Sequence, residues 1–194
     1  MRPVPDLQKI AVKLPLLVPR SAVDAFLPIF AAWRDAAPAD WVDLADNAHV
    51  GAGLAVQLVG RRCTVGVDLD PPAGLSYLHK NGLTGSDTER ACAALASALQ
   101  LAARLFADPA LPPTVLPQFD RVWLGVNDRV WFPNDDATEA ALAAPFGAAL
   151  DRLYGPGAWT RSPRAADPRE RFGWWIHPAN VPASFEALRA LLSG

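Results

Sequence analysis

The sequence lacks the features that mark several specialised classes of protein. Its two cysteines, Cys63 and Cys92, are too few for a disulfide framework and have no metal-knuckle spacing. Its formal net charge of −2 gives no basic surplus of the kind that nucleic-acid-binding proteins carry. We therefore expect a reducing, cytoplasmic compartment, with no nucleic acid as partner.

Long hydrophobic runs are also missing. Near the N-terminus, Pro3 and Asp6 interrupt any signal-like apolar segment. The longest apolar helix candidate, residues 91–107, contains Arg104 and is too short and too polar to cross a bilayer. We expect a soluble protein without a membrane partner.

The composition is that of a globular chain. Of its 194 residues, 51% are hydrophobic and 20% are charged, which is enough apolar material for a sizeable core. The length predicts one domain over residues 1–194, with the proline-rich segment 108–117 as a candidate boundary between two similar halves. The pattern of elements predicts an α+β fold, with a largely antiparallel sheet and helices packed mainly on one face.

Residues 119–134 predict a central hairpin. With Asn127 and Asp128 as the turn, Val126 lies opposite Arg129, and Leu124 lies opposite Trp131. Both faces of this hairpin are apolar, so both need a cover. One cover is the helix expected at residues 136–154.

A second hairpin is expected at residues 54–68. A turn at Gly60 and Arg61 places Leu58 opposite Cys63 and Val56 opposite Val65, so that the apolar residues share one buried face. The other expected elements are a strand at 7–18 with Pro15 near an edge or end, a helix at 21–35 interrupted at Pro28, a strand at 75–80, a helix at 86–107 with a Ser86–Glu89 capping box, a helix capped by Asp136, a loop at 155–168, a strand at 172–177 and a helix at 183–192.

One candidate polar site consists of Asp43, Asp46 and His49. On a helical turn their three-residue spacing puts them on one broad face, where they could bind a metal ion or exchange protons. The alternative is that the aspartates cap a helix and the histidine meets a carbonyl group. No motif favours a metal, so we predict none.

A second candidate is the pair Asp68 and Asp70, whose carboxylates share a strand face; the alternative, which we favour, is a strand that ends there. A third is the Tyr77, His79 and Lys80 group, next to a helix start that could hold an anion. If a polar site exists, we expect Asp46, His49, Tyr77 and His79 to converge. The full set of candidate binding residues is Asp43, Asp46, His49, Tyr77, His79, Lys80, Asn127, Asp128 and Asn134.

Seven tryptophans are many for this length. Trp174 and Trp175 are adjacent in an expected strand, so their rings point to opposite faces. We expect at least one of Trp123, Trp131, Trp174 and Trp175 to lie in a protein–protein interface, because uncovered aromatic surface concentrates at such contacts.

Six short motifs occupy residues 46–50, 74–77, 127–129, 133–134, 153–155 and 167–172. Together they resemble the pattern of an uncharacterised family of bacterial proteins. The resemblance implies a bacterial, cytoplasmic setting. It brings no activity, cofactor or site residue with it.

Two hypotheses of function follow. The first is a non-catalytic accessory or partner-binding protein, either a homo-oligomer or a subunit of a larger assembly, since no catalytic constellation or cofactor motif is present. The second is a small-molecule-binding protein or enzyme with a site between residues 43–49, 77–80 and 127–134. We expect the first.

Overall fold

The computed structural model describes residues 6–182 and 184–192. These residues form an α+β fold whose sheet is antiparallel throughout, as the sequence predicted. The helices are α1 (Phe26–Ala36), α2 (Asp87–Phe106), α3 (Asp136–Tyr154) and α4 (Phe185–Leu191), with two 3-10 turns, η1 (Arg20–Ala25) and η2 (Ala48–Val50). The strands are β1 (Ile10–Leu17), β2 (Trp41–Asp46), β3 (Leu54–Gly60), β4 (Cys63–Asp68), β5 (Gly74–His79), β6 (Leu116–Pro117), β7 (Val122–Val126), β8 (Trp159–Arg161) and β9 (Gly173–Pro178).

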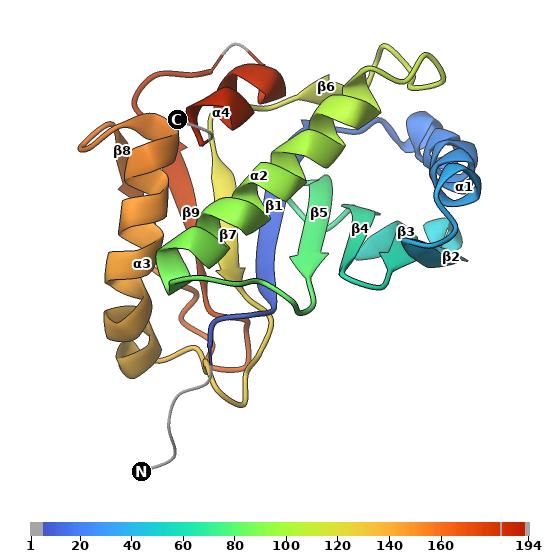
Figure 1. Ribbon diagram of the computed structural model, residues 1–194. Helices are drawn as coiled ribbons and strands as arrows, with labels where there is room; N and C mark the ends of the chain where they lie inside the picture. Colours follow the sequence, from blue (N-terminus) through green and yellow to red (C-terminus); the bar gives the residue numbers. More distant parts are fainter. Residues whose placement is uncertain (1–5, 183, 193–194) are drawn as a thin grey trace.

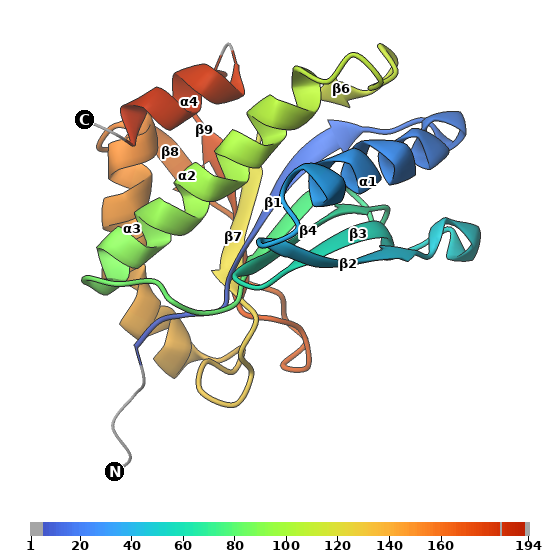
Figure 2. The same cartoon turned by 45° about the vertical axis from the view of Figure 1, so that its right-hand side comes forward.

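The strand order is β2-β3-β4-β5-β1-β7-β9-β8, and the short β6 pairs with the end of β1. β1 therefore joins two groups of strands, because it pairs with β5 on one side and with β7 on the other. The helices lie on one side of this sheet: α2 crosses its middle, α3 and α4 lie towards β9, and α1 lies towards β2 and β3 (Figures 1 and 2).

The alternation along β1 separates the two faces of the sheet. Ile10, Val12 and Leu14 are buried in the hydrophobic core beneath the helices. Lys13 alternates with them and points to the opposite face. None of the described helices covers that face (Figure 2). Alternate residues of a strand point to opposite faces, so one apolar and one mixed set define two different surfaces.

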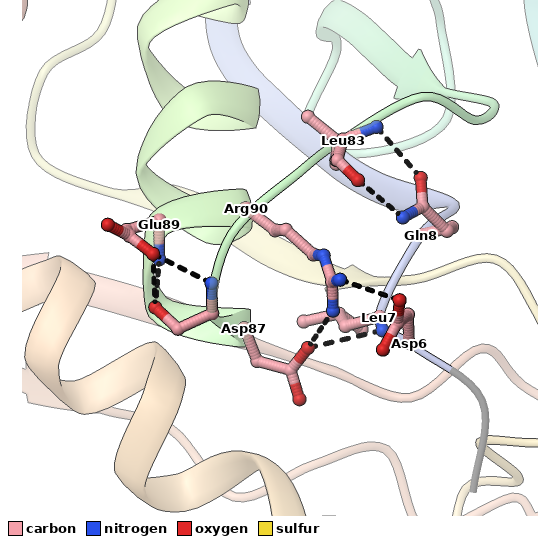
Figure 3. Close-up of polar contacts among 8 residues, drawn as sticks. Asp6, Leu7, Gln8, Leu83, Asp87, Glu89 and Arg90 are labelled. Atoms are coloured by element: carbon pink, nitrogen blue, oxygen red, sulfur yellow. Dashed lines mark hydrogen bonds and ion pairs between the residues drawn. The ribbon is translucent and has the colours of Figure 1, made fainter.

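Polar contacts tie the segment before β1 to the start of α2 (Figure 3). The Gln8 side-chain amide donates to the Leu83 carbonyl at 2.9 Å and accepts from the Leu83 N–H at 3.0 Å. The Arg90 guanidinium pairs with Asp6 at 2.7 Å and Asp87 at 2.8 Å. These contacts hold the central strand and the central helix in a fixed relation at one end.

The predicted capping box of α2 is confirmed. The Ser86 hydroxyl accepts from the Glu89 N–H, and the Glu89 carboxylate accepts from the Ser86 N–H at 2.7 Å. The helix predicted at residues 136–154 is also present, but Asp135 rather than Asp136 caps it, by accepting from the Thr138 N–H at 2.8 Å.

The predicted central hairpin is wrong in its second half. β7 exists, but the chain after it turns, with the Phe132 N–H donating to the Asp128 carbonyl at 2.8 Å. The favoured types of two-residue hairpin turn have positive φ, and neither Asn127 nor Asp128 has it. β7 instead pairs with β1 and β9, and Val130 is 84% exposed.

The predicted first hairpin has the right buried face from Val56 to Val67, but its register is wrong. Leu58 pairs with Val65 and Val56 with Val67, so the turn centres on Arg61 and Arg62. The error is two residues, which keeps the side chains from Val56 to Val67 on their predicted faces. All four paired residues are therefore fully buried. A β-bulge after Leu54 pairs that residue with Asp68 and so places it on the face opposite the predicted one.

Three smaller expectations also change. Pro15 lies in a central strand, at a point where the β7 ladder has ended at Lys13 and that of β6 starts at Leu16, so its missing N–H leaves no partner unpaired. The helix expected from Ser21 is a 3-10 turn followed by α1, which places Pro28 in the first turn, where helix N–H groups are unpaired anyway. The loop expected at 155–168 contains the short strand β8.

No helix in the described part of the chain is long and apolar enough to cross a membrane.

Two substitutions of equal shape test the one-sided burial of β3. Val56→Thr adds a hydroxyl to the fully buried face, and should lower the free energy of unfolding by about 1–3 kcal/mol. Val59→Thr adds the same hydroxyl on the opposite face, where the side chain is half-buried, and should change it by about 0.5 kcal/mol or less. Urea unfolding of both variants measures the difference, and equal losses would contradict the assignment of faces.

Candidate functional site

A row of paired residues crosses the face of the sheet that the helices leave uncovered. From β3 to β9 the cross-strand register aligns Gln57, Gly66, Ser76, Lys13, Trp123 and Trp175. The row ends in two tryptophans on neighbouring strands. Their rings are half-buried, in contrast to the fully covered apolar residues on the helix side.

The Trp123 ring packs against two glycines, Gly125 and Gly173. A Cβ built on Gly125 or Gly173 would collide with this indole, so the ring lies directly against the backbone of β7 and β9. On Gly125 that Cβ would also meet the Phe172 carbonyl oxygen. The Arg171 guanidinium lies over the same ring, 5.4 Å from its centroid. The Trp123 ring thus packs against Gly125 and Gly173, which we call the glycine floor, and beneath the Arg171 guanidinium.

A groove of about 470 Å³ lies beside these rings. We call it the tryptophan groove; its lining comes from the uncovered sheet face and from the segment between β8 and β9. It is lined by Lys13, Asp68, Asp70, Pro71, Ser76, Trp123, Pro163, Ala165, Glu170, Arg171, Gly173 and Trp175.

Asn134 fixes the outer wall of the tryptophan groove. It is 2% exposed, and its side-chain amide donates to the carbonyls of Ala165 at 2.8 Å and Asp167 at 2.9 Å. Arg164 donates to the Asn134 carbonyl at 3.0 Å and also pairs with Glu139. A buried amide with two backbone acceptors holds the segment before β9 against the start of α3.

The charges of the groove are partly paired. Lys13 Nζ lies 2.8 Å from Asp68 Oδ2 and 2.8 Å from the Asp70 carbonyl oxygen, and both ion-pair side chains are about nine-tenths buried. Asp70 Oδ1 accepts from the Gly53 N–H at 2.9 Å. Asp68 and Asp70 therefore act where strand β4 ends, as the favoured alternative predicted, and they also line the groove.

A second hollow, of about 750 Å³, lies on the helix side of the sheet. We call it the arginine cleft; it opens between α2, the β3–β4 turn and the loop before β2. It is lined by Ala39, Asp40, Trp41, Arg61, Arg62, Cys63, Tyr77, His79, Ser97, Gln100, Leu101 and Arg104.

The inner wall of the arginine cleft is a neutral hydrogen-bonded group. His79 Nε2 lies 2.9 Å from the Asn81 carbonyl oxygen, which only accepts, so this nitrogen carries the proton. Its Nδ1 therefore accepts from the Tyr77 hydroxyl at 2.8 Å. Burial lowers the pKa of His79, which favours this uncharged form.

Burial also keeps the neighbouring acids protonated. It raises the pKa of the Cys63 thiol to about 11, although the charge of Lys80 acts in the opposite direction. Burial likewise raises the pKa of Tyr77. At neutral pH Cys63 is a thiol rather than the nucleophilic thiolate, so the wall favours binding over covalent chemistry.

The structure does not bring Asp46 and His49 to Tyr77 and His79. Asp43 and Asp46 lie on strand β2 rather than a helix, and Asp46 and His49 line a separate hollow with η1 residues. Three strand spacings of about 4.8 Å, or about 14 Å, separate β2 from β5. Within the described ranges, no three His, Cys, Asp or Glu side chains are grouped so that they could hold a metal ion.

The remaining predicted binding residues have structural partners. Lys80 Nζ donates to the Gly60 carbonyl at 2.7 Å, and Asp128 pairs with Lys9 at 2.7 Å. The Asp128 carboxylate also accepts from the Val130 N–H at 3.3 Å, which stabilises the turn after β7. Asn127 is exposed in that turn, where its N–H donates to the Lys9 carbonyl.

The four predicted interface tryptophans lie in three different places. Trp174 is buried on the helix side, with its ring edge-on to Phe146 and under the Arg161 guanidinium. Trp123 and Trp175 line the tryptophan groove on the opposite face. Trp131 is 38% exposed, in a shallow hollow at the start of α3.

Sequence reasoning missed several residues that line the two hollows. Lys13 carries a readable signal, since it is a charged residue within an otherwise apolar central strand. Gly173 and Arg171 carry no signal in the sequence, because their role depends on which strand lies beside β9. Arg62 and Arg104 line one hollow only because α2 packs over the sheet (Figure 1).

Gly173→Ala tests the glycine floor. The added Cβ would collide with the Trp123 ring and lie 2.9 Å from the Leu124 carbonyl oxygen, so a rigid neighbour must move. We expect a loss of about 1–3 kcal/mol in the free energy of unfolding and a shifted Trp123 indole N–H signal in an NMR spectrum. Gly147→Ala in α3 is the control, because a Cβ on Gly147 meets no atom within 4 Å. This substitution should raise the free energy of unfolding by about 0.5–1 kcal/mol.

His79→Asn tests the protonation state of the cleft wall. The folded pKa of His79 lies below its ordinary value of 6.5, so the unfolded chain binds the proton first as the pH falls. The stability contributed by neutral His79 is therefore present above pH 6.5 and lost as the pH falls towards the folded pKa. Urea unfolding between pH 8 and 5 should show a steeper loss in the wild type than in His79→Asn, and parallel curves would contradict the assignment.

The chain was also compared with known proteins. No protein-family model matches it, and no curated protein matches it in sequence. The bacterial family resemblance stays a prediction.

Proposed function

We propose that this protein is a non-catalytic accessory protein that binds a segment of another protein in the tryptophan groove. The observation that carries the proposal is the pair Trp123 and Trp175, which face outwards from a sheet whose helices all lie on the other side. Indole rings are enriched where proteins meet, because they bury a large area at a small cost in conformational entropy.

The groove is already ordered before a partner arrives. The glycine floor fixes Trp123, and Asn134 holds the opposite wall through two hydrogen bonds. The Lys13–Asp68 ion pair fixes two further residues of the lining. A preformed groove spends less binding free energy on ordering side chains, which favours specific recognition of a short segment.

The lining indicates the chemistry of the partner. Lys13 and Asp68 neutralise each other, which leaves the carboxylates of Asp70 and Glu170 against the single charge of Arg171. A segment with one aromatic or aliphatic side chain and one basic side chain fits this combination, since the ring surface takes the first and the carboxylates take the second.

The groove supports binding better than catalysis. Ser76 is its one hydroxyl, and among the described residues no base is hydrogen-bonded to it. Lys13 is held in an ion pair. A nucleophile without an adjacent base is not activated.

A different protein fits the groove better than a second copy of this chain. A two-fold dimer places the same patch against itself, so a hollow of about 470 Å³ would face another hollow. A protruding segment of a different protein fills it. We place this partnership in the cytoplasm, on the basis of the two free cysteines.

Photo-crosslinking in the source cell tests the proposal. p-Benzoylphenylalanine in place of Ala165, an exposed groove residue, should give one main adduct whose mass identifies a different protein. The same probe in place of Ala140, exposed on α3, is the matched control and should give none.

Second substitutions make the result specific to the groove. Trp175→Ala or Glu170→Lys, added to the Ala165 probe, should reduce the adduct at least tenfold while the thermal unfolding midpoint stays close to that of the parent. Absence of any adduct, an adduct of two copies of this chain, or equal adducts from Ala140 would contradict the proposal.

A further inference from the structure

We propose that the arginine cleft is a binding site for a small organic anion, one with a phosphate or carboxylate head group and an apolar body about the size of one aromatic ring. The proposal is independent of the tryptophan groove, which lies on the other face of the sheet. It rests on the charges at the rim of the cleft and on the neutral surface at its base.

Three guanidinium groups line the rim. Arg61 and Arg62 come from the β3–β4 turn, and Arg104 comes from the last turn of α2. Within the part of the chain that the structure describes, none of the three forms an ion pair. This contrasts with Arg90, Arg161, Arg164 and Arg169, which all pair with carboxylates.

The arginines are positioned but not neutralised. Arg61 Nε donates to the Ala39 carbonyl at 3.0 Å, and the Arg104 guanidinium lies 4.3 Å from the centroid of the Trp33 ring. Among the described residues, Asp40 is the only carboxylate in the lining, which leaves a net positive rim. Three like charges at one hollow repel one another, and an anion bound between them relieves this repulsion.

Guanidinium groups also match the head group in shape. Their planar fork of N–H donors can form two parallel hydrogen bonds with a phosphate or a carboxylate. Arg62 is exposed, and its guanidinium has no hydrogen-bond partner among the described residues, so its donors are available to a ligand.

The base of the cleft suits an apolar body. Trp41 and Leu101 contribute apolar surface, and Cys63, Tyr77 and His79 are all uncharged at neutral pH. The Tyr77 hydroxyl proton is already donated to His79. A volume of about 750 Å³ is ample for a ring with one head group.

Calorimetric titration tests the site with phenyl phosphate, benzoate and benzyl alcohol as probes. Phenyl phosphate should bind most tightly, because its double charge faces several guanidinium groups, and benzoate should bind more weakly. Benzyl alcohol, which has the body without the charge, should give no measurable binding. Raising the salt concentration should weaken phenyl phosphate binding.

Arginine substitutions locate the binding. Arg62→Gln and Arg104→Gln should each weaken phenyl phosphate binding about tenfold or more, and the exposure of Arg62 makes its variant safe for folding. Arg121→Gln is the matched control, since this arginine lies outside the cleft in a pair with Asp120. Trp175→Ala, on the other face, should also leave the affinity unchanged.

Two kinds of result would contradict anion binding in the arginine cleft. Absence of phenyl phosphate binding at millimolar concentration would do so. Binding that survives both Arg62→Gln and Arg104→Gln, or that falls as much in Arg121→Gln, would show that the arginine cleft does not hold the anion.

Discussion

The alternation of side chains along β1 is the constraint on which the rest of the structure depends. β1 lies at the centre of the sheet, and Ile10, Val12 and Leu14 all point to the side where the helices pack. Because a strand has only two faces, every residue between them must point the other way. That places Lys13 on a surface without helices, and the register of the neighbouring strands then brings Ser76 and Trp123 to the same surface.

Close approach between β7 and β9 shapes that surface further. Two tryptophans directly opposite each other would crowd a flat sheet, but the glycines beside them let the Trp123 ring lie down against the backbone. The ring then forms a wall of the groove instead of projecting into solvent. Burial of Asn134 adds the other wall, because its amide has to meet acceptors and the carbonyls of residues 165 and 167 provide them.

The sequence predicted what is local and missed what depends on partners. The Ser86–Glu89 capping box and the buried face from Val56 to Val67 follow from neighbouring residues and were predicted correctly. The hairpin after β7 was not, because residues 129–132 carry the same apolar signal whether they pair as a strand or turn back towards α3. The same holds for the candidate sites. The opposite directions of the Trp174 and Trp175 side chains follow from strand alternation. That Arg62 and Arg104 line one hollow depends on where α2 packs, which the sequence does not show.

Strands β4 and β5 contribute to both hollows, which differ in their chemistry. Ser76 lines the tryptophan groove and Tyr77, the next residue, lines the arginine cleft, so β5 contributes to both from opposite faces. The groove contains the Lys13–Asp68 ion pair, two indole rings and the carboxylates of Asp70 and Glu170, which suits a protein segment. The cleft contains three guanidinium groups that form no ion pair with any described residue, above a neutral base, which suits a small anion. Since a packed sheet separates them, occupation of one need not disturb the contacts of the other, and each can be altered by a substitution that leaves its neighbour on the strand in place.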